Sequence, residues 1–377
     1  MKFQVNRDVF ADAVTWVART IPNRPAIPAL AGLKINVLDE GTISLGSRDS
    51  DVSSHIDIEG DVIEAGEILV NGKLLAELVR VLPYAPITFS LVDNQVEIEC
   101  GSSHISMKTM AMEDYSQLPP MPERIGQIDG HQWQEAVSQV SVAASNDDTL
   151  PMLVSICIEI EGSSMSLMAT DRYRLAIRDL EWTPEDENIS QRIMVRASRL
   201  LDVAKNIGSE GEIEVFLGVQ GQSRLIGFSA GGRQNTIQLI DGDYPQVRSL
   251  FPENVNGYAT VNRGEFNDVL RRSRLLVEKN AAVRLSFSEG ELLVEAGQGD
   301  RAQISDALGA ELDGDDISLA FNPAFLVEGI GVMNEDYVRL SFTQKDKPVV
   351  LNEQNDDGEV SQDFRLLLMP IRTFGSN

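Results

Sequence analysis

The segment VNRDVFADAV (5–14) occurs twice more along the chain, as IDGHQWQEAV (128–137) and VNRGEFNDVL (261–270). Each copy joins a β-branched residue to a polar turn and then to an aromatic residue five positions after the start. The apolar residues that follow recur at helical spacing, which predicts a helix with one apolar stripe facing a core. Because the copies begin at residues 5, 128 and 261, the repeated unit has the size of a domain.

A second helical segment repeats with the same period, as ILVNGKLLAELVRVL (68–82), IMVRASRLLDVAKNI (193–207) and LAFNPAFLVEGIGVM (319–333). Runs with the alternating pattern of β-strands fill the chain between these helices. Two helices and several strands per unit favour antiparallel sheet packed against a pair of helices. The predicted class is α+β, with three repeated domains over residues 1–121, 125–252 and 257–377.

Length and composition indicate a multidomain globular protein. A chain of 377 residues exceeds what one hydrophobic core supports. With 42% hydrophobic and 24% charged residues, its composition is ordinary for a soluble protein. No apolar run reaches the roughly 20 residues of a membrane span, so no membrane partner is predicted. Cys100 and Cys157 fall in strand-like runs and are interpreted as buried free thiols of a reducing cytoplasm, with a disulfide as the alternative.

The net charge of −26 argues against broad nucleic-acid binding, which depends on lysine and arginine. A local basic surface can nevertheless lie on an acidic body. Several basic residues fall on or beside the polar sides of the repeated helices, where the alternative is an ordinary solvated surface. The candidates for phosphate contact are Lys73, Arg80, Arg196, Arg199, Lys205, Arg271 and Arg272.

No set of residues predicts catalysis. The three histidines, His55, His104 and His131, are scattered, and ordinary surface positions explain them better than a metal site does. No nucleophile elbow, phosphate-binding loop or zinc-protease motif is present. We therefore predict no catalytic residue, no metal and no cofactor.

Five stretches resemble the bacterial sliding clamp, the β subunit of the replicative DNA polymerase. They are ATDRYRLA (169–176), DYPQVRSLFP (243–252), LLLMPIR (366–372), MKFQV (1–5) and RPAIP (24–28). The resemblance covers the whole chain and implies a head-to-tail homodimeric ring of six domains, with helices around a central hole and sheets outside. A closed ring holds duplex DNA topologically, so weak contacts independent of base sequence suffice, and an acidic exterior is compatible with that role.

The resemblance also implies site residues. It adds Arg24 to the predicted DNA contacts and supports Lys73. It implies that the edge strand 101–110 meets the first helix of the third domain in another copy, with Ile105 and Met107 packing against Leu275 and Leu276.

A further implied site is a hydrophobic pocket of domains two and three that takes a short peptide of a polymerase or another partner. Flexible methionine and other apolar walls suit such a ligand. The sequence departs from the family pattern at Arg172, where a small residue is common, and at Ser249, where a basic one is common. The implied pocket residues are Leu153, Thr170, Arg172, Tyr173, Arg174, Leu175, Pro245, Val247, Leu250, Asn322, Phe325, Met369, Pro370, Ile371 and Arg372.

The function we predict is that of a processivity factor without catalytic activity. Its partners would be double-stranded DNA, a second copy of itself, the replicative polymerase subunit, the clamp loader and other proteins with a clamp-binding peptide. It would work in the cytoplasm, associated with the nucleoid. The alternative is a non-catalytic three-domain scaffold that binds peptides and does not encircle DNA; an enzyme is a third class.

Overall fold

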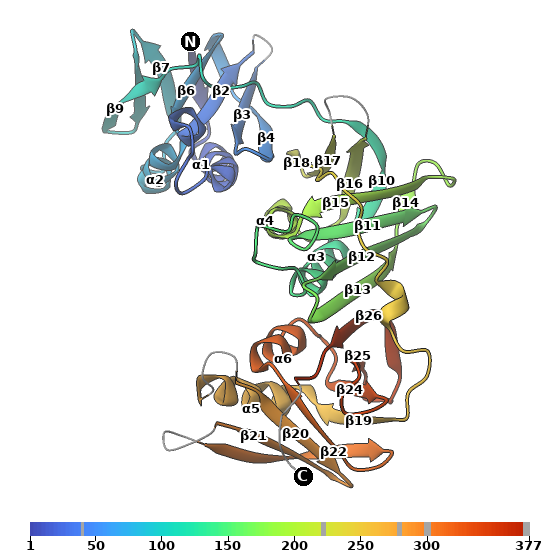
Figure 1. The fold of residues 1–377 in the computed structure, drawn as a ribbon. Coiled ribbons are helices and arrows are strands. Elements are labelled where there is room, and N and C mark those ends of the chain that lie inside the picture. The colour runs from blue at the N-terminus through green and yellow to red at the C-terminus, as the bar shows by residue number, and fades with distance from the viewer. Residues whose placement is uncertain (39–40, 220–223, 277–280, 298–302, 372–377) are drawn as a thin grey trace. The chain divides into compact units, whose positions relative to one another are not determined.

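The computed structural model describes residues 1–38, 41–219, 224–276, 281–297 and 303–371 (Figure 1). The chain divides into two compact units. The first comprises Met1–Gly130 with Asp202–Leu239, and the second comprises His131–Leu201 with Ile240–Asn377. Each unit is described by itself.

A continuous antiparallel sheet runs through the first unit in the order β10-β16-β17-β18-β4-β3-β2-β6-β9-β8-β7-β1-β5. Its alternating runs bury every second residue, as the sequence pattern predicts. The strands are β1 (Lys2–Val5), β2 (Gly32–Val37), β3 (Thr42–Arg48), β4 (Val52–Glu59), β5 (Asp61–Glu64), β6 (Gly66–Asn71), β7 (Ile87–Val92), β8 (Gln95–Cys100), β9 (Ser103–Met110), β10 (Glu123–Asp129), β16 (Glu212–Gly218), β17 (Leu225–Ala230) and β18 (Arg233–Gln238).

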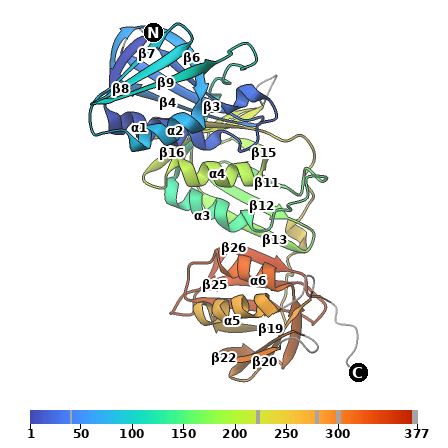
Figure 2. The ribbon, with the colours of Figure 1, turned by 90° about the vertical axis from the view of Figure 1, so that its left-hand side faces the viewer.

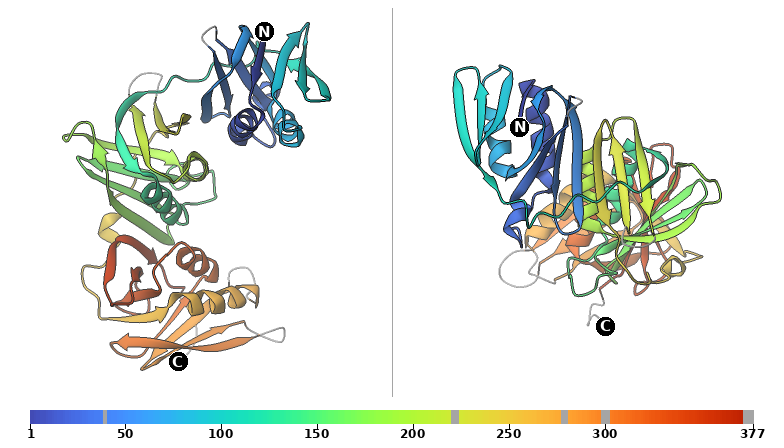
Figure 3. Two further views of the ribbon diagram at one scale, coloured as in Figure 1. Left: turned by 180° about the vertical axis from the view of Figure 1, so that it is seen from behind. Right: turned by 90° about the horizontal axis from the view of Figure 1, so that it is seen from above.

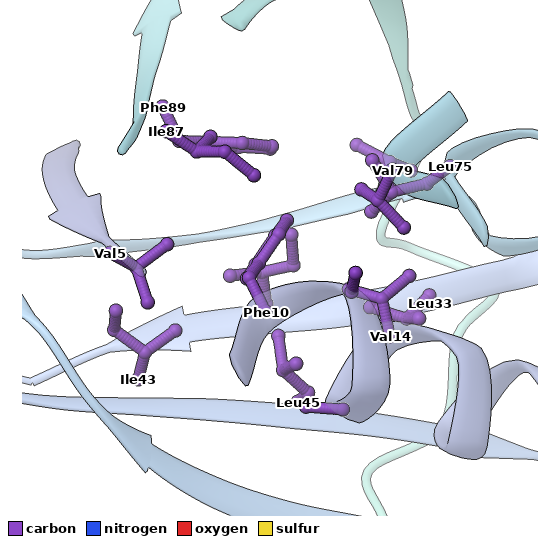
Figure 4. Packing of buried hydrophobic residues seen from close by; sticks show 14 of the residues in the cluster. Val5, Phe10, Val14, Leu33, Ile43, Leu45, Leu75, Val79, Ile87 and Phe89 are labelled. Atoms are coloured by element: carbon purple, nitrogen blue, oxygen red, sulfur yellow. The ribbon is translucent and has the colours of Figure 1, made fainter. Parts of the chain in front are cut away.

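Two helices, α1 (Arg7–Val17) and α2 (Gly72–Val81), lie side by side in this unit (Figure 2). Both begin at an asparagine whose side chain accepts hydrogen bonds from main-chain N–H groups of the first turn, Asn6 for α1 and Asn71 for α2. The repeated aromatic residue of α1, Phe10, is fully buried among strand residues (Figure 4). Its ring centroid lies 5.9 Å from that of Phe89, so truncation to alanine would cost about 3–5 kcal/mol.

The second unit contains a 12-stranded antiparallel sheet in the order β15-β11-β12-β13-β26-β25-β24-β19-β22-β21-β20-β23. The helices α5 and α6 lie next to each other on this sheet (Figure 3). The strands are β11 (Ser155–Glu161), β12 (Ser164–Thr170), β13 (Arg174–Glu181), β15 (Ser190–Arg196), β19 (Gly257–Asn262), β20 (Val283–Ser288), β21 (Glu291–Ala296), β22 (Ile304–Asp313), β23 (Ile317–Phe321), β24 (Tyr337–Phe342), β25 (Val349–Gln354) and β26 (Val360–Leu368), with a two-residue strand β14 (Thr183–Pro184). The helices are α3 (Gly130–Ser141), α5 (Arg263–Leu276) and α6 (Pro323–Ile330), while α4 (Ala197–Ile207) spans the boundary of the two units.

Three short 3-10 helices complete the described elements: η1 (Ala18–Thr20), η2 (Pro28–Ala31) and η3 (Arg248–Leu250). The order strand, helix, strands, helix, strands occurs three times, which confirms the predicted α+β class with three repeats. Cys100 and Cys157 are free and buried, as predicted. Among the described residues, no helix is long and apolar enough to cross a membrane, and no group of histidine, cysteine and carboxylate side chains could hold a metal ion.

The repeats are also joined to one another by strand pairing. In the first unit, β4 of the first repeat pairs with β18, the last strand of the second repeat. In the second unit, β13 occupies the place of β4 in the second repeat, and it pairs with β26, the last strand of the third. The same edge of one repeat therefore meets the same edge of the next at both junctions.

Candidate functional site

A tight turn between β12 and β13 carries several of the predicted pocket residues. The Oγ1 hydroxyl of Thr170 donates to the carbonyl of Arg174 at 2.7 Å. The carboxylate of Asp171 accepts from the N–H groups of Tyr173 and Arg174, each at 3.0 Å. Arg172 has a positive φ of 80°. The turn thus holds Tyr173 outward, with 58% of its surface exposed.

Arg174 stabilises this turn. Its side chain is only 6% exposed, with Nε donating to Oδ2 of Asp171 at 2.9 Å and Nη1 donating to Oε2 of Glu328 at 2.7 Å. The guanidinium also lies 4.3 Å from the ring centroid of Phe325. Asp171 and Glu328 were missed by sequence reasoning. The sequence shows charged residues at the turn and on the second repeated helix, but it does not show that Arg174 forms ion pairs with Asp171 and Glu328.

The chain after β26 runs directly beside the turn. The N–H of Met369 donates to the carbonyl of Tyr173 at 2.9 Å, and the N–H of Ile371 donates to the carbonyl of Ala320 at 2.7 Å. Asn322 caps α6, because its side chain accepts from the N–H of Ala324. These bonds bring the turn, the C-terminal segment and the start of α6 together.

A fourth segment, residues 243–252, reaches the same place through its apolar side chains. Tyr244 and Val247 belong to one buried cluster with Leu175 of β13 and Leu367 of β26. Burial raises the pKa of the Tyr244 hydroxyl, and it raises the pKa of the neighbouring Cys157 thiol, so both groups stay uncharged near neutral pH.

The predicted pocket residues therefore fall into a buried set and an exposed set. The buried side chains form the frame of the site, and Leu175 and Val247 belong to a hydrophobic cluster. The exposed apolar side chains are those available to a ligand. Buried are Leu153, Thr170, Arg174, Leu175 and Val247; half-buried are Asn322, Phe325 and Pro370; exposed are Arg172, Tyr173, Pro245, Leu250, Met369 and Ile371; Arg372 lies outside the described residues.

The positive φ at Arg172 predicts a stabilising substitution. A residue with a Cβ in this backbone region costs about 1–2 kcal/mol of folding free energy, which glycine avoids. Part of this gain is lost because glycine makes the unfolded chain more flexible and so increases the entropy lost on folding. We expect Arg172→Gly to raise the free energy of unfolding by roughly 0.5–1 kcal/mol. Urea unfolding measures the change. Arg172→Ala is the matched control and should give no gain; an equal gain in both variants would assign the effect to the arginine charge instead.

Three predicted DNA contacts lie on or beside the helix α2 of the first unit. Lys73 of α2 donates from Nζ to the carbonyl of Pro22 at 3.0 Å and to Oδ1 of Asn23 at 2.6 Å, which places it beside the exposed Arg24. Arg80 is exposed at the other end of α2, and its Nε lies 3.3 Å from Thr15 of α1. Basic groups thus occur at both ends of this helix pair.

The other predicted DNA contacts are more dispersed. Lys205 of α4 and Arg271 of α5 are exposed, and Arg199 is half-buried. Arg196 forms an ion pair with Asp148, and Arg272 forms one with Asp306 of β22 at 2.7 Å. Those two guanidinium groups are already paired with carboxylates of the chain, so they are weaker candidates than Arg24, Lys73 and Arg80.

The predicted dimer contacts need one correction. Met107 is 6% exposed and belongs to the core of the first repeat, so its side chain is not part of a free surface. Ile105 is half-buried against the same core. Leu275 is 85% exposed, and the side chain of Leu276 lies outside the described residues.

Comparison with known proteins assigns the three repeats. Models of the DNA polymerase III beta subunit match the chain throughout: the N-terminal domain at residues 1–119, the central domain at 127–246 and the C-terminal domain at 248–372. The chain belongs to this family, the bacterial sliding clamps. As a sliding clamp it is a processivity factor of the DNA polymerase, an accessory protein and not an enzyme.

Full-length relatives agree with this assignment. The beta sliding clamp of Streptomyces coelicolor is 42% identical over 377 residues, which is 100% of both chains. That of Micrococcus luteus is 44% identical over 313 residues, covering 83% of this chain and 100% of the relative. A crystal structure of the Bacillus subtilis sliding clamp has the same fold, with a TM-score of 0.91, 23% identity and coverage of 99% of this chain and 100% of that one.

Proposed function

We propose that two copies of this chain close head to tail into a ring around duplex DNA and tether the replicative polymerase to it. The observation that supports the ring is a pair of strand edges without a neighbour. Residues 103–108 of β9 pair only with β8, and residues 304–309 of β22 pair only with β21, within the described part of the chain.

The internal repeat indicates what these edges bind. β22 is the third repeat's counterpart of β4 and β13, and β9 is the first repeat's counterpart of β18 and β26. Since β4 pairs with β18 and β13 with β26, both antiparallel, β22 is expected to pair with β9 of a second copy. Two such junctions close a two-chain ring, because the interface is heterologous and closes on itself. The proposed contact of β9 is therefore with the strand β22, and not with the helix α5 alone as the sequence analysis expects.

The main chain of β9 is oriented for that pairing. The N–H of Thr109 bonds the carbonyl of Asn94, so in an antiparallel ladder residues 107 and 105 bond β8 as well. The N–H and C=O groups of His104, Ser106 and Lys108 then point to the open edge. An unpaired edge of this kind is a ready site for another strand. The exposed Leu275 of α5, a helix packed against β22, supplies apolar surface beside the seam.

The remaining parts of the function use the sites described above. Exposed Arg24, Arg80, Lys205 and Arg271, with Lys73, would contact phosphates without reading bases. The surface of Tyr173, Leu250, Met369 and Ile371 would take a short peptide of the polymerase, the clamp loader or another partner. Acting on replicating DNA, the protein would work in the cytoplasm, at the nucleoid.

A threading experiment tests the ring. The protein is incubated with a linear duplex biotinylated at both ends, streptavidin is added to block the ends, and the mixture is filtered through a gel in high salt. High salt removes phosphate contacts but leaves a topological link intact. We expect the protein to stay with the blocked duplex and to leave it after one internal restriction cut. Equal loss from blocked and cut DNA would favour the peptide-binding scaffold that does not encircle DNA.

A further inference from the structure

The first unit contains a hollow that the established and proposed functions leave unused, whereas the residues of the peptide pocket belong to the second unit. The volume of the hollow is about 460 Å³. The floor is the face of β2, β3, β4 and β18 that points away from the core, and the wall is the segment 117–121. A smaller hollow of about 180 Å³ shares Ser53, Gln117, Pro119 and Thr236 with it, so the two form one groove.

The wall of this groove is firmly held. Tyr115, just before it, is buried with Ala29 and Leu69, and burial raises the pKa of its hydroxyl to about 12, so this anchor is uncharged. A methyl group of Leu118 fills the place that a Cβ at Gly46 would take, and the sulfur of Met121 does the same at Gly227. Any larger residue at those glycines would push the segment away from the sheet.

The groove is the first unit's counterpart of the peptide site. The turn at Asp49, whose N–H bonds the carbonyl of Val52 at 2.8 Å, matches the turn in which the N–H of Asp171 bonds the carbonyl of Arg174. The next residues continue the match. Ser53 of β4 pairs with Thr236 of β18, as Leu175 of β13 pairs with Leu367 of β26.

The walls of the two sites correspond in the same way. Gln117 and Leu118 of Tyr115-Ser-Gln-Leu118 line the hollow with Ser53 of β4 and Thr236 of β18. Tyr244 and Val247 of Tyr244-Pro-Gln-Val247 pack with Leu175 of β13 and Leu367 of β26. A similar backbone arrangement therefore occurs twice in the chain, with different side chains on its floor and wall.

That difference sets the chemistry of a ligand. The paired leucines of the peptide site are replaced by a hydroxyl pair, with Oγ of Ser53 and Oγ1 of Thr236 2.6 Å apart. Among the described residues, the main hollow is lined by amides, hydroxyls, Lys34, His55 and the apolar wall, and by no carboxylate, although the chain has a net charge of −26. The carboxylates of Asp49 and Asp51 line the smaller hollow, together with Arg48 and Arg224, so the acidic side chains of a ligand belong in the main hollow. Lys34 and His55 do have acidic neighbours, Glu67 at 2.8 Å and Asp57 at 3.2 Å, which a ligand carboxylate would join or replace.

We propose that this groove is a second docking site, which binds an extended peptide segment of a partner protein carrying acidic and other polar side chains. Two adjoining hollows along one wall segment suit a peptide strand, whose main chain can bond side-chain amides. Asn36 and Gln117 supply such amides, and within the described residues their side chains have no partner. Acidic side chains of the segment would reach Lys34 and His55. The groove lies within one unit, so the proposal does not depend on the ring.

The test uses a phage-displayed library of random peptides of about nine residues, which span roughly 30 Å when extended. The library is selected on the full-length Met369→Ala protein, which weakens the other site. Enriched peptides are synthesised with a fluorophore and titrated by anisotropy. We expect peptides rich in aspartate or glutamate whose affinity falls about tenfold or more in Lys34→Glu and in Asn36→Trp, which fills the floor. Their affinity should be equal for the wild-type and Met369→Ala proteins.

Several outcomes would overturn the proposal. One is a selection that yields no peptide sensitive to Lys34→Glu or Asn36→Trp. Another is a set of peptides lost only in Met369→Ala, which would belong to the first site. Displacement of every peptide by duplex DNA would assign the groove to nucleic acid. Lys34→Met, which removes the charge without adding one, keeps the test valid if Asn36→Trp lowers the melting temperature. None of these results affects the DNA-threading experiment.

Discussion

Ser106→Pro is expected to convert the dimer into a monomer while leaving the fold of each chain intact. Ser106 lies in β9, and its N–H points to the open edge, not to β8. Proline removes that donor, and its ring obstructs an incoming strand. We expect the loss to be about 3 kcal/mol of association free energy, or roughly 100-fold in affinity, at each seam. A ring of two chains has two seams, and both are weakened. Sedimentation velocity measures the mass.

Ser106→Ala is the matched control, because it keeps the N–H and should remain a dimer. Circular dichroism and the melting of the monomer check the fold, since proline is tolerated on an edge strand whose N–H faces solvent. The monomer should also fail to stay on end-blocked DNA in high salt. If Ser106→Pro sediments as a dimer and stays on that DNA like the wild type, β9 is not the seam.

Leu250→Ala combined with Met369→Ala is expected to lower the affinity for a polymerase-derived clamp-binding peptide by about 100-fold. Both side chains are exposed apolar groups of the second unit, 55% and 39% respectively, at the ends of segments held by β13 and β26. Each truncation of such an anchor costs about 1–2 kcal/mol of binding free energy. Isothermal titration with the purified peptide measures the loss.

Ile63→Ala serves as the control for that pair, because Ile63 of β5 is 64% exposed in the other unit and should leave the affinity unchanged. Arg174→Ala distinguishes a residue that holds the site together from the exposed residues that contact the peptide. It removes the partner of Asp171 and Glu328 and should lower the melting temperature as well as the affinity, whereas the double variant should melt like the wild type. Unchanged peptide affinity in the double variant would refute the assignment of the surface.

The repeat, the helices and the strands follow from local pattern. Phe10, Trp133 and Phe266 recur at one position, and all three side chains are buried. Apolar spacing and asparagine caps act within a few residues, so the sequence contains the information needed to predict them. The family resemblance rests on residues 169–176, 243–252 and 366–372, and the described residues of these three segments contribute to one site.

Side-chain partnerships could not be predicted in the same way. Arg174 and Glu328 are far apart in the chain, and only the packing of α6 near β13 brings them together. Side chains alternate between the two faces of β9, and the sequence of the strand does not show which face is buried. Met107 could have been on the surface if the register of β9 were shifted by one residue. Which face of β9 meets the core depends on the neighbouring strands and not on β9 itself.

By itself, then, the sequence determined three α+β repeats, the absence of a recognisable catalytic motif and the family resemblance, since periodicity and short motifs are local properties. Only the tertiary structure decided which strand edges are left open, which pocket residues are exposed and which cations are already paired. The polar groove beside residues 117–121 is likewise a feature that only the tertiary structure shows. Its floor comes from β2, β3, β4 and β18, and long-range strand pairing is what places Ser53 beside Thr236.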